Sequence, residues 1–179
     1  MSNLLGLEEE NRATSAQIEP DNTEAESNMK SGANWFYWIA GLSVINSLVY
    51  MSGADWSFLA GLGVTQLAEA FVDIAIEQGA PSAMKAIAIV FSLAAVVVFG
   101  LFGYYSGKRY TTVFAIGIGL YLLDGLLLLA LGVFASAGFH AFALFFMIRG
   151  FLAGRELNAH APGKVFQQPP PPNANYPGT

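Results

Sequence analysis

Long apolar blocks separated by short polar segments fill the middle of this chain. The blocks lie at about residues 34–52, 83–105, 111–134 and 139–157. Each approaches the length of about 20 residues that an α-helix needs to cross the apolar core of a bilayer. Apolar side chains cover these blocks on all sides, which is typical of helices surrounded by lipid or by other helices. The pattern therefore predicts an all-α membrane protein with four transmembrane helices in one domain, residues 33–157.

The segment at about 56–79, between the first two blocks, follows a different pattern. Three carboxylates recur there at every fourth position: Glu69, Asp73 and Glu77. Apolar residues take the opposite side, so we expect an amphipathic helix on the membrane surface with its acidic face in water. The alternative is that the three carboxylates on one face bind a cation or a basic partner.

Polar segments flank the apolar blocks at both ends. Residues 1–32 are acidic and rich in Asn, Ser and Thr, and they hold too few apolar residues to offset the entropy of ordering. Residues 158–179 are polar and Pro-rich, and the run at 169–172 favours an extended polyproline helix. We expect both tails to be disordered. The first residues carry glutamates where a cleaved signal peptide has basic residues, so the first apolar block is expected to be retained.

The basic residues of the short loops lie mainly on one side of the predicted bundle, and the segment between the first two blocks offers only Lys85, at its far edge. Lys108 and Arg109 lie between the second and third blocks, and Arg155 and Lys164 follow the fourth. Since Lys and Arg in short loops mark the cytoplasmic side, both termini are expected in the cytoplasm. The amphipathic helix and an uncharged bend at 135–138 would then lie on the outer side of a bacterial inner membrane, which the chain crosses several times.

Composition removes several classes of function. Only 12% of the 179 residues are charged, against about 25% in soluble domains, and none is cysteine. Disulfides, thiolate catalysis and cysteine-based metal sites are therefore excluded. The sequence contains no nucleophile elbow, no metalloprotease helix and no phosphate-binding or dinucleotide-binding glycine motif. We expect a protein that is not an enzyme and holds no cofactor. Because it lacks a basic patch on a soluble domain, we also expect it to bind no nucleic acid.

Two charges stand inside the last two apolar blocks. Asp124 lies twelve positions before residue 136 and Arg149 twelve positions after residue 137, on either side of the bend at 135–138. At about 1.5 Å per residue, both would lie about 18 Å from that bend, near the middle of the bilayer. A charge at this depth costs about 2.5–3.5 kcal/mol, so we expect the two residues to form an ion pair. Such a pair either fixes the register of the hairpin or lines a path for an ion, a proton or a substrate. The third possibility is that no pair forms, with Arg149 reaching the interface and Asp124 protonated.

Other polar groups in the blocks are isolated. His140 stands near the predicted outer end of the fourth block, where we expect an interfacial residue rather than a ligand. Asn46 in the first block is expected to form a hydrogen bond with a neighbouring helix. Neither adds a catalytic centre, because no pair of nucleophile and base can be assembled from the residues of this chain.

Two stretches carry a resemblance to other proteins. WFYWIAGLSVIN at 35–46 and GLGVTQ at 61–66 resemble segments of uncharacterised small bacterial membrane proteins. The resemblance implies a location in the bacterial inner membrane, and it transfers no activity and no site residue.

The absence of chemical motifs favours a non-enzymatic integral membrane protein, either a structural or an accessory subunit. Its partners would be the lipid bilayer and another membrane protein or a second copy of the chain. The alternative is a small transporter or channel component whose polar centre is formed by Asp124 and Arg149.

Overall fold

The computed structural model describes residues 2–52 and 61–160, with side chains from Asn22 onward. Within these ranges the chain forms five helices and no strand, which confirms the all-helical prediction. The helices are α1 (Ser2–Ser52), α2 (Gly63–Glu77), α3 (Met84–Gly107), α4 (Thr111–Ala130) and α5 (Phe134–Ala159). The proline run of the predicted C-terminal tail lies outside the described residues.

Three of these helices, α3, α4 and α5, are long and apolar enough to cross a membrane. The prediction of four transmembrane helices is therefore too high by one for the described part of the chain. The first predicted span, 34–52, forms the second half of α1, and polar residues interrupt its apolar run. Ser43, Asn46 and Ser47 are buried there, so this half of α1 meets other helices with polar as well as apolar groups.

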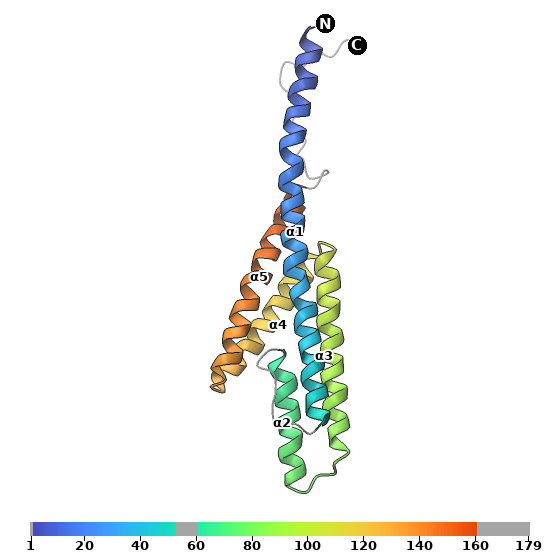
Figure 1. Cartoon of the computed structure of the whole chain (residues 1–179), viewed down its shortest axis with the longest axis vertical. Coiled ribbons are helices and arrows are strands. Elements are labelled where there is room, and N and C mark those ends of the chain that lie inside the picture. The colour runs from blue at the N-terminus through green and yellow to red at the C-terminus, as the bar shows by residue number, and fades with distance from the viewer. Residues whose placement is uncertain (1, 53–60, 161–179) are drawn as a thin grey trace, which may run out of the picture.

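α1 is the longest helix and the axis of the bundle. Its 51 residues span about 76 Å. Figure 1 shows that its first half extends beyond the other helices, while its second half packs along α3 and α5. The core lies between these helices and α4, where the ring centroid of Phe36 lies 5.6 Å from that of Phe114 and 6.0 Å from that of Phe99. Such aromatic contacts hold the helices together through apolar surface.

Part of the polar segment 1–32 belongs to this bundle, although its composition predicts disorder. The chain is helical from Ser2, and Met29 is 1% exposed. Gly32 crosses Gly150 of α5 so closely that a Cβ atom on Gly32 would lie 2.6 Å from the Cα atom of Gly150. Glycines at such a crossing let two backbones meet, and the packing that they permit offsets the entropy of ordering the segment. The prediction of a disordered tail is wrong for this stretch.

The turn between α4 and α5 falls at residues 131–133, before the predicted bend at 135–138. Gly132 adopts a φ of 78°, in the left-handed region that glycine enters at little cost. The N–H groups of Gly132 and Val133 donate to carbonyls in the last turn of α4, in the Schellman pattern that ends many helices. The small residues predicted to form the bend instead begin α5. The equal depths expected for the two ion-pair residues therefore do not hold.

α2 lies against α3, and its N-terminal end lies beside α4 (Figure 1). Its two faces are reversed relative to the predicted surface helix. Glu69 is 6% exposed, whereas Phe71 is 70% and Ile74 is 52% exposed. The side that carries Glu69 therefore faces the bundle, and the apolar side faces outward. A helix with this orientation suits apolar surroundings rather than water.

Candidate functional site

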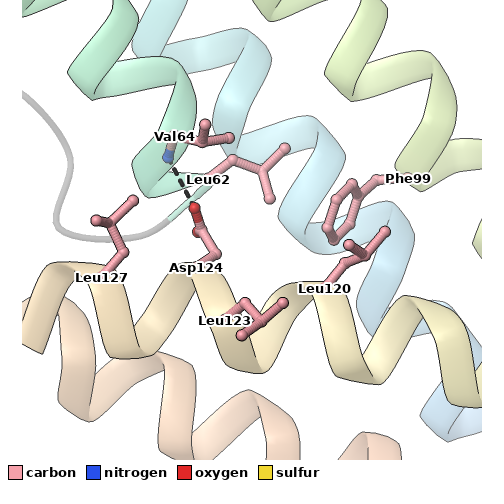
Figure 2. A pocket seen from close by; sticks show the side chains of 7 residues that line it. All are labelled: Leu62, Val64, Phe99, Leu120, Leu123, Asp124 and Leu127. Carbon is pink, nitrogen blue, oxygen red and sulfur yellow. Dashed lines mark hydrogen bonds between the residues drawn. The ribbon is translucent and has the colours of Figure 1, made fainter.

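Asp124 is the buried acidic centre of the bundle. It lies on α4, is 7% exposed, accepts two backbone hydrogen bonds through its carboxylate and forms a third hydrogen bond with His140. The backbone N–H of Gly63 donates to Oδ2 and that of Val64 to Oδ1, both at 2.7 Å. Nε2 of His140 lies 2.9 Å from Oδ2. Figure 2 shows the carboxylate reaching from α4 to the first turn of α2, so three helices meet at this one side chain.

The contact with α2 is a helix cap supplied by another helix. The first N–H groups of a helix have no partner within it, and they carry a partial positive charge. Leu62, the residue before α2, offers no side-chain hydrogen bond to them, and Asp124 takes this role instead. The N–H of Leu62 donates in turn to Oγ of Ser43 on α1, at 2.9 Å. The start of α2 is thereby fixed to both α1 and α4.

His140 is the second member of this centre and comes from α5. It is 1% exposed, and its ring stacks on that of Tyr121 with the centroids 4.3 Å apart. A Cβ atom on Gly125 would lie 2.8 Å from the Cβ atom of His140, so this glycine gives the histidine its room. Nδ1 lies 2.8 Å from the carbonyl oxygen of Ser136, one helical turn earlier. The ring of His140, predicted to be interfacial, is enclosed between α4 and α5 and takes part in a polar contact inside the bundle.

Arg149 does not take part in this centre. Its side chain is exposed, and none of the salt bridges among the described residues contains it. The reason is the position of the turn. Asp124 lies eight positions before Gly132 and His140 eight positions after it, whereas Arg149 lies seventeen positions after it. At about 1.5 Å per residue, these separations are about 12 Å for the first two and about 25 Å for Arg149. The structure therefore replaces the predicted pair of Asp124 and Arg149 by Asp124 and His140.

Glu69 forms a second buried polar contact, on α2. Its Oε1 accepts hydrogen bonds from the hydroxyls of Ser47 on α1 and Ser92 on α3, each at 3.0 Å. Buried polar atoms need such partners, and here two neighbouring helices provide them. The contact ties the middle of α2 to α1 and α3, in addition to the cap that ties its start to α4.

The other two carboxylates of the predicted acidic face have separate environments. Oδ1 of Asp73 accepts a hydrogen bond from the hydroxyl of Tyr50 at 3.0 Å and lies 3.4 Å from Nζ of Lys85. Burial, followed by the bond to Asp73, raises the pKa of the Tyr50 phenol to about 12. Glu77 is exposed. The described residues contain no acidic, His or Cys group of three that could hold a metal ion, so the three carboxylates do not converge on one cation.

A cavity of about 300 Å³ lies beside Asp124, between α2, α3 and α4. Figure 2 shows the carboxylate in its wall, directed at the first turn of α2. The other lining residues are apolar: Leu62, Val64, Phe99, Leu120, Leu123 and Leu127. Val64, Leu120, Leu123 and Leu127 are each more than a third exposed, so the pocket opens to the outside of the bundle, and its apolar wall suits an apolar occupant better than an ion.

Comparison with known protein families, with curated proteins and with solved structures found no match to this chain. The fold and the site define an all-helical protein in which three apolar helices could cross a membrane. Within its described part, a buried Asp–His centre joins α2, α4 and α5.

Proposed function

We propose that this protein is a non-enzymatic integral membrane protein that serves as a structural or accessory subunit. The observation that carries the proposal is the use of the Asp124 carboxylate by the fold itself. Its two oxygens accept N–H groups from α2, one of them also forms a hydrogen bond with His140 of α5, and the residue is 7% exposed. A buried polar centre whose members satisfy one another fixes how the helices are arranged. Such a centre leaves little of the carboxylate for a substrate.

The partner of such a subunit would be another membrane protein or a second copy of the chain. The first half of α1 supports this proposal, because it is helical and extends beyond the other helices (Figure 1). Most helices in proteins gain their stability from packing one face against a neighbour rather than from local propensity. A helix that extends this far is therefore suited to pairing with a partner.

The location that we propose is a bacterial inner membrane, with both chain ends in the cytoplasm. This orientation requires that the second half of α1, which packs along α3 and α5, crosses together with α3, α4 and α5. Contacts at the basic turn between α3 and α4 support this orientation. Nη2 of Arg109 in this turn lies 3.2 Å from Oε2 of Glu26 on α1. The side-chain amide of Asn158 on α5 donates a hydrogen bond to the carbonyl oxygen of Arg109 at 3.0 Å. The middle of α1, at Glu26, and the end of α5, at Asn158, therefore lie with Lys108 and Arg109, the kind of residues that mark the cytoplasmic side.

Extraction in a mild detergent followed by native mass spectrometry tests the subunit proposal. We expect an assembly of fixed stoichiometry, with a second copy or with another membrane protein, that survives purification. A variant lacking residues 1–21 should lose this assembly and keep the bundle, whose described core begins at Ala25. A chain that stays monomeric at every concentration, with or without these residues, would contradict the proposal.

A small transporter or channel component is the second candidate function, with its polar centre at Asp124 and His140. The buried carboxylate of Asp124 favours it, since an ionisable group within apolar helices often marks an ion path. Flux measurements in proteoliposomes distinguish the two functions. A transporter should show proton or cation flux that Asp124→Asn abolishes and that Glu77→Gln, at an exposed position, leaves unchanged. Absence of flux in the wild type supports the structural role.

A further inference from the structure

We propose that Asp124 and His140 form an intramembrane proton-binding site, and that its proton holds the start of α2 within the bundle. The proposal goes beyond a structural or accessory role, because it assigns a ligand, the proton, to the contact between α4 and α5. It does not depend on the identity of any partner protein.

The hydrogen-bond geometry fixes the number of protons in the pair. Nδ1 of His140 must donate to the carbonyl oxygen of Ser136, since a carbonyl oxygen only accepts. In a neutral imidazole, Nε2 would then be an acceptor facing a second acceptor, Oδ2 of Asp124, at 2.9 Å. This distance is that of a hydrogen bond, which requires a proton between the two atoms. The pair therefore holds one proton more than a neutral imidazole beside an ionised carboxylate.

The surroundings place that proton on the imidazole. The two oxygens of Asp124 accept the backbone N–H groups of Gly63 and Val64 at 2.7 Å, and such short bonds are typical of an ionised acceptor. The positive end of α2 also favours an ionised carboxylate. The centre is thus an imidazolium–carboxylate pair with no net charge, and each charge offsets part of the cost of burying the other.

The groups around the pair and around its contact with α2 come from all five helices. Tyr121 of α4 is the ionisable side chain that stacks on His140. α5 contributes the carbonyl of Ser136, and α2 contributes its first two amides. α3 contributes Phe99 to the cavity wall and α1 contributes the hydroxyl of Ser43 to the start of α2, and neither of these groups titrates in water. A change of protonation in the pair is therefore transmitted to the amides of α2.

Loss of the proton would break the contact of Asp124 with the amides of Gly63 and Val64. Without the proton, Nε2 of His140 and Oδ2 of Asp124 are two acceptors 2.9 Å apart, and their repulsion displaces the carboxylate. The two amides then lose their acceptor, which destabilises the first turn of α2. Asp124 and His140 are 7% and 1% exposed, and the pocket beside Asp124 has an apolar wall that offers water no polar path to the pair. We therefore expect exchange of the proton and loss of the contact between Asp124 and α2 to occur together.

Nitrogen-15 NMR of histidine-labelled protein in lipid nanodiscs reads this proton directly. The chain has two histidines, and His160 is the internal reference. Its Nδ1 also lies close to the carbonyl of the residue four positions earlier, at 3.0 Å, but its ring is exposed. We expect both ring nitrogens of His140 to be protonated beside an ionised Asp124, and Asp124→Asn to leave a neutral ring with its hydrogen on Nδ1. A neutral His140 beside an ionised Asp124 in the wild type would overturn the proposal.

Amide hydrogen exchange distinguishes a contact between Asp124 and α2 that depends on the proton from one that has only a structural role. The glutamine side chain of His140→Gln can donate to Asp124 but binds no proton. As the pH rises until the His140 signal loses its proton, exchange at Gly63 and Val64 should increase by roughly tenfold relative to amides of α3, the size expected for loss of a helix cap. His140→Gln should remove this step and His160→Gln should keep it. Persistence of the step in His140→Gln would overturn the proposal; if that variant does not fold, absence of the step in the wild type would do so.

Discussion

Replacing Asp124 by alanine distinguishes between the two partners that have been considered for it, His140 and Arg149. In the structure the carboxylate lies 2.9 Å from His140 and caps α2, while Arg149 is exposed on α5. The effect of Asp124→Ala on stability should therefore depend on whether His140 is present. It should not depend on whether Arg149 is present.

The size of the effect follows from the hydrogen bonds that Asp124→Ala removes. The buried N–H groups of Gly63 and Val64 lose their acceptor, at a cost of about 1–3 kcal/mol for each group left unsatisfied. Removing one member of a buried ion pair costs about 3–5 kcal/mol. The two contributions do not add in full, because His140 can release its proton once the carboxylate is gone and then leaves no unpaired buried charge. We therefore expect Asp124→Ala to lower the free energy of unfolding by about 3–5 kcal/mol.

Double-mutant cycles on reversible unfolding in mixed detergent micelles measure which partner is coupled to Asp124. The cycle of Asp124→Ala with His140→Ala should give a coupling energy of about 1–3 kcal/mol, because the two side chains share a hydrogen bond. In the cycle with Arg149→Ala, the single effects should add to within about 0.5 kcal/mol. A coupling to Arg149 as large as that to His140 would refute the assignment and restore the pair predicted from the sequence.

Three further predictions use the same unfolding assay. Gly32→Ala should lower the free energy of unfolding by about 1–3 kcal/mol because its Cβ atom meets the backbone of α5. Gly100→Ala, with open space around it, should stabilise α3 by up to about 1 kcal/mol. Glu69→Ala should lower the free energy of unfolding by about 1–3 kcal/mol because buried serine hydroxyls lose their acceptor, and Glu77→Ala by less than about 0.5 kcal/mol. Equal effects of the two glycine variants, or of the two glutamate variants, would contradict the packing. The raised pKa of Tyr50 gives stability that is fully present below pH 10.0 and is lost as the pH rises through about 12, and Tyr50→Phe should remove this loss.

The position of one turn explains why the sequence predicts the wrong partner for Asp124. Small uncharged residues at 135–138 are typical of a bend, but they also suit the first turn of a helix that packs closely. Gly132 is the better signal, because a glycine after an apolar run commonly ends a helix. Counted from Gly132, His140 lies at the same distance as Asp124. A shift of a few residues in the turn therefore changes the predicted partner from His140 to Arg149.

The apolar blocks predict α3, α4 and α5 well, because continuous apolar sequence is needed whichever helices or lipids surround them. The features that the sequence does not predict depend on contacts between distant residues. Order in the second half of the segment 1–32 comes from the crossing of Gly32 with Gly150, and the start of α2 comes from a cap on Asp124, about sixty positions away. No local pattern contains either contact, so hydropathy alone predicts disorder in the first case and a surface helix in the second.

The orientation of α2 has a more general cause. Periodicity shows that a helix has two different faces, but it does not show which face meets the surroundings. Beside three helices with apolar outer surfaces, the face that costs most to expose is the acidic one. Glu69 obtains from Ser47 and Ser92 the hydrogen bonds that water would otherwise provide, while Phe71 faces outward. The same reasoning accounts for Asp124: in such a protein the interior of the bundle is the polar environment. Acidic residues at helical spacing between apolar blocks therefore predict contacts with other helices at least as well as they predict a solvated surface.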